Sequence, residues 1–322
     1  MSRVLLAPME GLADWLLRDV LTQAGGYDVA VGEFVRVAGP KMPSRSFLNV
    51  CPELGHGGRT SAGVPVVVQL LGNDPGRMAE SAAQLARLSP PGIDLNFGCP
   101  APTVNRSGAG AVLLEDPALV GRIVSAVRRA VPAAIPVSAK MRLGVSDTAT
   151  ALECAHAIVA GGASSLVVHA RTRDEFYRPP AHWEWIARIR EAVSIPVVAN
   201  GEVWSLDDYL RCRQVTGCDD VMIGRGAVAD PLLARRIKAY LSGAAQSADE
   251  RSDWNEVAQL VAQFWRRLPE KMAARYRPGR IKMWLRSLSD AFPEAEMLYR
   301  DVRVQAGVDA VSETLARHGV AV

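Results

Sequence analysis

Short runs of apolar residues recur along the chain, and most of them are separated by segments with the polar and apolar spacing of helices. Several runs are rich in Val and Ile, as expected for strands that are buried on both faces. There are eight such runs, at residues 4–7, 29–32, 66–70, 93–96, 137–140, 165–169, 197–200 and 220–223. This alternation predicts an α/β fold. A (β/α)8 barrel is its simplest closure, and a doubly wound open sheet is the alternative.

Two Asp-Pro pairs mark predicted helix starts within this pattern. Asp116-Pro117 precedes a helical segment over 118–130, and Asp230-Pro231 precedes another over 232–240. In each pair we expect the Asp to cap the helix and the Pro to occupy its first turn. The segment 39–63, in contrast, contains several prolines and glycines. This composition predicts a long irregular loop after the second strand.

A change in composition after residue 241 predicts a domain boundary. Residues 242–248 are mostly Ser, Gly and Ala, which suits a linker. Beyond them, apolar residues fall at helical spacing from Trp254 to Leu268 and again from Ile281 to Leu288, and no strand pattern is present. We therefore expect a barrel domain over 1–241, a linker over 242–250 and a small all-α domain over 251–322.

The overall composition is that of an ordinary globular protein, with 49% hydrophobic and 22% charged residues among 322. No apolar window approaches the length of a membrane span. Pro8 and Glu10 interrupt the N-terminal segment before the apolar core of a signal peptide could form. A cytoplasmic location is therefore expected. The five cysteines are widely spaced and form no C-x-x-C pair, which predicts free thiols rather than disulfides or a zinc site.

The net charge is only +3, so binding to nucleic acid would require local clustering of basic residues. One cluster lies at 266–286, where eight basic residues and one acidic residue give a net charge of +7. Trp265, Tyr276 and Trp284 lie within it or beside it. The pattern is typical of a phosphate-binding surface with stacking groups. A solvated helical face with its aromatic residues in the core fits the same pattern.

The segment from Ile93 to Pro100 carries the most distinctive chemistry. Its apolar run breaks at Asn96 into a tight turn that places Cys99 between a glycine and a proline. A cysteine of a hydrophobic core normally lies inside an apolar run. We therefore interpret Cys99 as a functional thiol.

The carboxyl ends of the strands form the active site of a (β/α)8 barrel, and here the predicted ends are unusually polar. Lys140 and His169 can both donate hydrogen bonds to an electron-rich ring such as a reduced flavin. The glycine-containing turns after the seventh and eighth strands are where such barrels commonly bind a phosphate. The strand-end residues are Pro8-Met9-Glu10, Glu33, Gln69, Asn96 with Cys99, Lys140 with Arg142, His169 with Arg171, Asn200-Gly201-Glu202 and Gly224-Arg225-Gly226.

Together these segments resemble the tRNA-dihydrouridine synthases. The resemblance runs in order from residue 4 to about residue 290, and its most specific element is the D-x-N-x-G-C-P pattern at 94–100. The segments 33–36 and 280–285 further resemble the bacterial C-type branch of that family. This resemblance implies reduction of uridine at position 16 of tRNA. The remaining segments that carry it are 8–11, 69–72, 140–142, 169–172, 200–202 and 224–226.

The resemblance implies an FMN-containing barrel, NADPH as the reductant and a helical C-terminal domain that helps to hold tRNA. It implies that Cys99 is the general acid, that Asn96 and Arg171 face the uracil, and that the tRNA is oriented by Arg36, Tyr177, Arg280 and Lys282. Two residues depart from the family pattern: Ala170 replaces the usual glycine, and Pro102 replaces a lysine of C-type relatives. The residues implied to contact FMN are Pro8, Met9, Glu10, Gln69, Lys140, His169, Asn200, Gly201, Glu202, Gly224 and Arg225.

The implied reaction suits a thiol. Hydride delivery from the flavin to C6 of uracil leaves negative charge at C5, so a proton donor is needed across the ring. A thiol with a pKa of about 8.5 is mostly protonated at neutral pH. Two alternatives remain. One is a flavin-free, phosphate-binding lyase or isomerase with Lys140 and His169 as base and acid. The other, indicated by the basic C-terminal segment, is a tRNA-binding factor with a vestigial enzymatic site. We expect a monomer without a membrane or an obligate protein partner.

Overall fold

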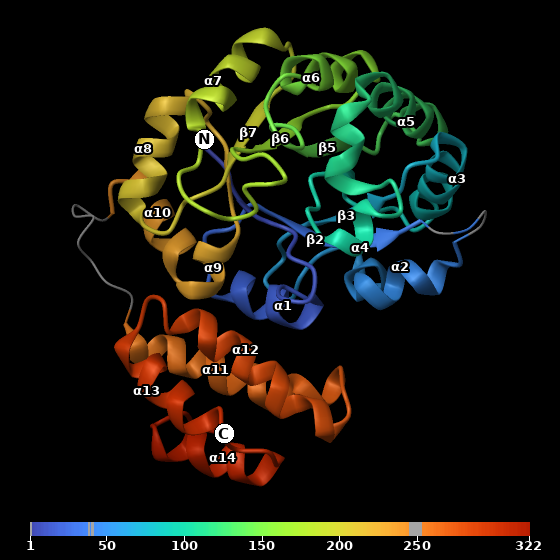
Figure 1. The fold of residues 1–322 in the computed structure, drawn as a ribbon. Coiled ribbons are helices and arrows are strands. Elements are labelled where there is room, and N and C mark those ends of the chain that lie inside the picture. Colours follow the sequence, from blue (N-terminus) through green and yellow to red (C-terminus); the bar gives the residue numbers. More distant parts are fainter. Residues whose placement is uncertain (1, 38, 40–41, 245–252) are drawn as a thin grey trace.

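The computed structural model describes residues 2–37, 39, 42–244 and 253–322. Eight parallel strands form a closed barrel, in which β1 pairs with both β2 and β8. Helices surround the barrel, and a further group of helices lies against one side of it (Figure 1). The predicted barrel is confirmed, and the open doubly wound sheet is excluded because the sheet closes on itself.

Each strand overlaps one of the predicted apolar runs. The largest difference is in β2, which continues to Arg36 instead of ending at Gly32. A shift in register between Val31 and Phe34 interrupts the alternation of side chains there, so the sequence pattern ended too early. The strands are β1 (Val4–Leu6), β2 (Val29–Arg36), β3 (Val66–Leu71), β4 (Ile93–Phe97), β5 (Val137–Arg142), β6 (Leu166–His169), β7 (Val197–Asn200) and β8 (Val221–Ile223).

The helices around the barrel confirm one predicted cap and correct another. Asp116 caps α5, accepting a hydrogen bond of 2.8 Å from the Leu119 amide. Asp230 instead accepts from the Leu232 amide and closes a turn, so α10 begins only at Leu233. The helices are α1 (Trp15–Gln23), α2 (Ser44–Val50), α3 (Pro75–Ala86), α4 (Pro102–Asn105), α5 (Pro117–Ala130), α6 (Ala151–Ala160), α7 (Trp183–Ala192), α8 (Leu206–Thr216), α9 (Arg225–Ala229) and α10 (Leu233–Leu241), with the 3-10 helices η1 (Pro52–His56) and η2 (Gly110–Glu115).

The segment that was expected to be one long loop contains α2 and η1. Three of its prolines and glycines lie at the ends of these elements. Pro43 is the N-cap of α2, Pro52 begins η1, and Gly57 ends η1 in the left-handed conformation. These positions are favourable for Pro and Gly, and for this reason their presence did not exclude helices.

Residues from Trp254 onward form helices only, within the part of the chain that the structure describes. They are α11 (Trp254–Arg267), η3 (Leu268–Glu270), η4 (Ala274–Tyr276), α12 (Arg277–Leu288), α13 (Pro293–Val302) and α14 (Val308–Arg317). We refer to them as the C-terminal helices. Helix α11 contacts α1, and α12 contacts α9. The predicted linker at 242–250 falls mostly outside the described residues, which omit 245–252.

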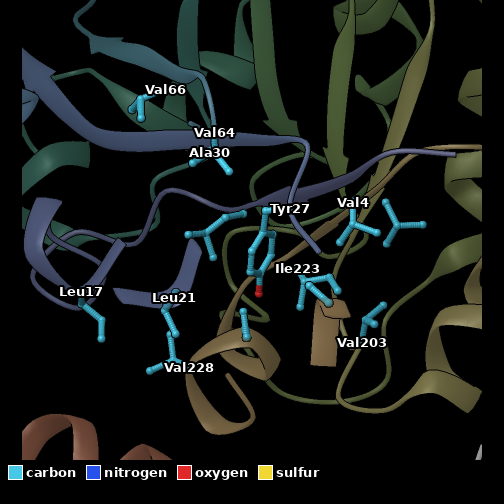
Figure 2. Packing of buried hydrophobic residues seen from close by; sticks show 14 of the residues in the cluster. Val4, Leu17, Leu21, Tyr27, Ala30, Val64, Val66, Val203, Ile223 and Val228 are labelled. Carbon is cyan, nitrogen blue, oxygen red and sulfur yellow. The ribbon is translucent and has the colours of Figure 1, made fainter. Parts of the chain in front are cut away.

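Two apolar layers hold the barrel together. The larger one lies between the strands and the helices, where Tyr27 stands among side chains of β1, β8 and α1 (Figure 2). The smaller one fills the barrel interior and consists of Leu5, Ala7, Val31, Val167, Val198 and Met222. Because Ala7 and Met222 also line the cavity at the carboxyl ends of the strands, this inner layer forms the floor of that cavity.

Two adjacent glycines give a test of the packing between the β1–β2 connection and α10. Both have left-handed backbones, with φ of +93° at Gly25 and +90° at Gly26. A Cβ at Gly26 would lie 2.2 Å from a backbone carbon of Ala234, whereas at Gly25 the nearest atom is 3.7 Å away. Gly25→Ala should cost about 1–2 kcal/mol in the free energy of urea unfolding from backbone strain alone. Gly26→Ala should cost clearly more, and equal losses would contradict the packing described.

Candidate active site

The carboxyl ends of the eight strands surround a cavity of about 450 Å³. Every strand, or the loop that follows it, contributes to the wall. The structure brings together all of the residues that were expected to contact a flavin: Pro8, Met9, Glu10, Gln69, Lys140, His169, Asn200, Gly201, Glu202, Gly224 and Arg225. Asn96, Cys99 and Tyr177 line the same cavity. The other predicted site residues, Arg36, Arg171, Arg280 and Lys282, are not part of its wall.

Cys99 lies in a turn that Asn96 shapes. The Asn96 side-chain oxygen accepts hydrogen bonds of 2.9 Å from the backbone amides of both Gly98 and Cys99, and Asn105 donates to the Cys99 carbonyl. Burial raises the pKa of the Cys99 thiol above its usual value, so the thiol is protonated at neutral pH and can act as an acid. All five cysteines are free, as predicted, and the other four are buried in the core.

Lys140 and His169 lie at neighbouring strand ends in the cavity wall. The Lys140 ammonium donates to the Asn200 side-chain oxygen at 2.8 Å. Burial, together with the positive charge of Arg142, lowers the pKa of Lys140 to about 7. Burial and the surrounding cations also lower the pKa of His169 well below its usual value, so the imidazole is neutral. Its Nδ1 atom is buried and has no hydrogen-bond partner among the described residues.

Arg171 differs from its expected place. It was expected to face the substrate base, but it is fully buried and lies behind the cavity wall. Its guanidinium pairs with the Glu202 carboxylate and also donates to the Arg178 carbonyl at 2.6 Å. Trp204 donates to the other oxygen of Glu202. Arg171 therefore holds the loop after β7 in place instead of entering the cavity.

Arg142 was recognised as a strand-end residue, but the sequence did not indicate what it contacts. Its guanidinium donates to the carbonyls of Gly98 and Phe176 and lies 5.2 Å from the centre of the Tyr177 ring. Arg225 lies over the same ring, at 4.7 Å. Tyr177 is thus held between two cations at the cavity. Phe34, Phe176 and Trp204 also line the cavity. No sequence pattern indicated Phe176 and Trp204, because both lie in loops without periodicity.

Arg36 and the two departures from the family pattern, Pro102 and Ala170, are not part of the cavity wall. The Arg36 guanidinium donates to the Ser107 hydroxyl at 2.6 Å, just beyond α4. Pro102 is the first residue of α4, a position where proline is favourable because its missing N–H would have no helical partner. Ala170 is fully buried and does not line the cavity. Its additional methyl group therefore packs in the core.

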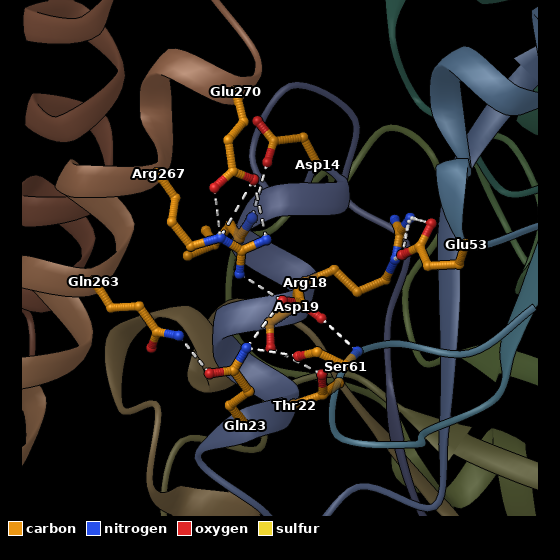
Figure 3. Close-up of polar contacts among 11 residues, drawn as sticks. Asp14, Arg18, Asp19, Thr22, Gln23, Glu53, Ser61, Gln263, Arg267 and Glu270 are labelled. Atoms are coloured by element: carbon orange, nitrogen blue, oxygen red, sulfur yellow. Dashed lines mark hydrogen bonds and ion pairs between the residues drawn. The ribbon is translucent and has the colours of Figure 1, made fainter. Parts of the chain in front are cut away.

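The basic segment at 266–286 is used largely within the protein. Arg280 is buried and pairs at 2.9 Å with Asp14, the N-cap residue of α1. Arg267 pairs with Asp19 of the same helix at 2.6 Å, and Lys271 lies 3.1 Å from Asp14. Figure 3 shows Asp14 and Asp19 facing the C-terminal helices. Arg280 and Lys271 were counted as surface cations, but the structure places them in this interface.

Two of the three aromatic residues of this segment pack in the core, as in the alternative of a solvated helical face with buried aromatic residues. Trp284 is fully buried and Trp265 nearly so, whereas Tyr276 is exposed. Lys282, which was expected to orient tRNA, donates to the backbone carbonyl of Gln305 and is half-buried. The exposed cations of the segment are Arg266, Arg275 and Arg286. The basic surface is therefore smaller than the charge of +7 indicated.

Sequence comparison identifies close relatives. Residues 5–315 match the protein family described as dihydrouridine synthase. The chain is 58% identical to the tRNA-dihydrouridine(16) synthase of Ralstonia nicotianae, over 94% of this chain and 92% of that protein. It is 52% identical to the protein of the same name from Aquipseudomonas alcaligenes, over 98% of this chain and 99% of that protein.

Solved structures show the same fold at low sequence identity. Histamine dehydrogenase from Rhizobium sp. 4-9 has a TM-score of 0.55 and 15% identity, covering 81% of this chain and 48% of that chain. A 2-naphthoyl-CoA reductase complex also has a TM-score of 0.55, with 10% identity over 75% of this chain and 50% of that chain. Among the described residues, no helix has the length and apolar character needed to cross a membrane.

The interface through Arg280 can be tested by stability measurements. Arg280→Ala leaves the buried Asp14 carboxylate with Lys271 as its remaining cationic partner, so we expect a loss of about 3 kcal/mol in the free energy of urea unfolding. Arg286→Ala, in the same helix, removes an exposed pair with Asp290 and should cost less than about 1 kcal/mol. Similar losses in the two variants would contradict the interface.

The lowered pKa of Lys140 predicts a pH dependence of stability. Lys140 has a folded-state pKa of about 7, against about 10.4 in an unfolded chain. Between these values the unfolded state binds the additional proton, so stability rises with pH. Wild type should therefore gain stability relative to Lys140→Met as the pH is raised from 7 to about 9.5. A difference in unfolding free energy that stays constant over this range would show that Lys140 keeps an ordinary pKa.

Proposed function

The chain belongs to the dihydrouridine synthase family, and on this basis we propose that it reduces the C5=C6 bond of uridine at position 16 of tRNA, with bound FMN and with NADPH as reductant. Relatives at 52–58% identity carry the name tRNA-dihydrouridine(16) synthase. The observation that carries the proposal is the cavity itself. Its lining includes Cys99, whose thiol is protonated at neutral pH, together with Lys140 and His169, and this combination supports the proposal.

The cavity residues fit a flavin. Lys140 offers a donor, and the buried Nδ1 of His169 has no partner among the described residues. Gly201 has a left-handed backbone, with φ of +116°, and carries no side chain that would fill the wall beside His169. We propose that FMN is held by the eleven lining residues named above. When bound, the flavin supplies the hydride that adds to C6 of the base.

In this proposal Cys99 supplies the proton that C5 requires. The thiol S–H bond breaks, the proton adds to C5, and the sulfur keeps the electron pair as a thiolate. Arg142 lies behind the turn, donating to the Gly98 carbonyl at 2.9 Å, and its positive charge stabilises the thiolate that forms. Asn96 keeps the thiol in place through the two amides of the turn.

The substrate base has to leave the folded RNA to reach this cavity, at an unstacking cost of a few kcal/mol. We propose that Tyr177 and Phe176, both partly exposed in the cavity wall, receive the base, and that Arg36 contacts the tRNA beside it. The C-terminal helices would add phosphate contacts through exposed cations such as Arg275. Arg280 and Lys282 would act through the interface and the helical packing.

We further propose that residues 1–241 are the catalytic domain and 251–322 the tRNA-binding domain, and that the protein acts as a cytoplasmic monomer.

Mapping dihydrouridine in tRNA tests the reaction and the position together. tRNA from cells that lack this protein should lose dihydrouridine at position 16 and keep it elsewhere in the D-loop. Restoring wild type should restore the modification. Cys99→Ala should not restore it, although the purified variant should still show flavin absorbance. Unchanged modification at position 16 would refute the assignment, and equal rates with NADH and NADPH would refute the proposed reductant.

A further inference from the structure

Asp94 is a buried carboxylate to which neither the sequence nor the mechanism above gives a role. It is 1% exposed and belongs to β4. Side chains alternate along a strand, and Ile93, Leu95 and Phe97 pack in the layer between strands and helices. Asp94 and Asn96 therefore point into the barrel. A polar or charged group in such a place is unfavourable unless it is hydrogen-bonded. The hydrogen-bond partners of Asp94 therefore indicate what this residue does.

The register of three adjacent strands supplies the partners. Asp94 lies opposite Gln69 of β3 and opposite Ser138 of β5. Its Oδ2 accepts from the Gln69 amide at 2.7 Å, and its Oδ1 accepts from the Ser138 hydroxyl at 2.6 Å. Each oxygen of the Asp94 side chain therefore accepts one hydrogen bond from a neighbouring strand.

A chain of hydrogen bonds continues from Asp94 to Cys99. The Gln69 oxygen accepts from the Asn96 amino group at 2.7 Å, and the Asn96 oxygen accepts from the amides of Gly98 and Cys99. Backbone amides can only donate, so the Asn96 oxygen must face the turn and its amino group must face Gln69. Gln69 must then turn its own amino group toward Asp94, where the Oδ2 atom accepts from it. The two ends of the chain require the same orientation.

We propose that Asp94 is the positioning residue of this site. Through Gln69 and Asn96 it fixes which atoms of these two amides face the cavity, and it fixes the turn that carries Cys99. Each amide uses one N–H in the chain and keeps a second one for a ligand of the cavity that both residues line. The effect on turnover rests on the proposed function, whereas the orientation of the turn does not.

Replacing Asp94 distinguishes this role from simple packing. Asp94→Leu keeps a similar volume and removes the acceptor, so Gln69 loses its fixed orientation. Asp94→Asn keeps an oxygen for Gln69, and its amino group can donate to the Ser138 hydroxyl, which accepts as readily as it donates. Ser138→Ala is the matched control, since it removes the other partner of Asp94 and leaves the chain to Cys99 complete.

Alkylation of Cys99 by iodoacetamide, followed by mass spectrometry, reports the turn without requiring catalysis. The other four cysteines are at most 3% exposed, and their continued protection shows that a variant is folded. Asp94→Leu should raise the alkylation rate of Cys99 about fivefold to tenfold, the factor that corresponds to one lost buried hydrogen bond. Asp94→Asn and Ser138→Ala should remain within about twofold of wild type. A wild-type rate in folded Asp94→Leu overturns the proposal.

Gln69→Leu decides the case if Asp94→Leu does not fold. It removes the link between Asp94 and Asn96, so it should raise the alkylation rate of Cys99 by a similar factor of about fivefold to tenfold. A wild-type rate in folded Gln69→Leu overturns the proposal. With tRNA as substrate, Asp94→Leu should lower kcat more than it changes KM. If alkylation responds as expected but no dihydrouridine forms in wild type, the proposed function fails and the positioning role stands.

Discussion

The hydrogen bonds to one buried carboxyl group, that of Asp94, connect the strand pairing of the barrel with the polar wall of the cavity. Asp94 can remain inside the barrel only because β3, β4 and β5 pair in a register that brings Gln69 and Ser138 beside it. A shift of one residue would turn Asp94 into the apolar layer and Leu95 into the cavity. The same register brings Asn96 beside Lys140. The strand pairing that closes the barrel is therefore also what sets the polar wall of the cavity.

Helix α1 connects this wall to the C-terminal helices. The loop before α1 supplies Pro8 to Glu10 and Leu12 to the cavity. Arg280 donates to the Leu12 carbonyl at 2.6 Å and to the Asp14 side chain, while Asp14 itself caps α1 through the Leu17 amide. A residue of the C-terminal helices thus contacts the backbone of a cavity loop. Movement of these helices on binding a large substrate would act directly on that loop.

Features that depend on residues close together in the sequence could be predicted from the sequence. The strands, the turn at Cys99 and most of the cavity wall followed from alternation, turn residues and the rule that functional residues gather at the carboxyl ends of strands. Arg171 and Arg280 did not, because their places depend on partners that no local pattern specifies. Arg171 pairs with Glu202 across a neighbouring strand end, and Arg280 pairs with Asp14, which is 266 residues away. A motif shows that a residue is basic, but it does not show where the side chain of that residue points.

The electrostatics of the cavity favour an anionic ligand. Lys140, Arg142 and Arg225 line it, and Arg171 lies behind its wall, paired with Glu202. Burial lowers the pKa of each of the four cations, to about 10 for Arg171. Neighbouring cations lower the pKa of Lys140 and Arg171 further. The free protein therefore has an unfavourable concentration of positive charge, which the phosphate of a bound cofactor would offset. Because a nearby anion would raise the pKa of Lys140, ligand binding and protonation of Lys140 are coupled, and each favours the other by the same free energy.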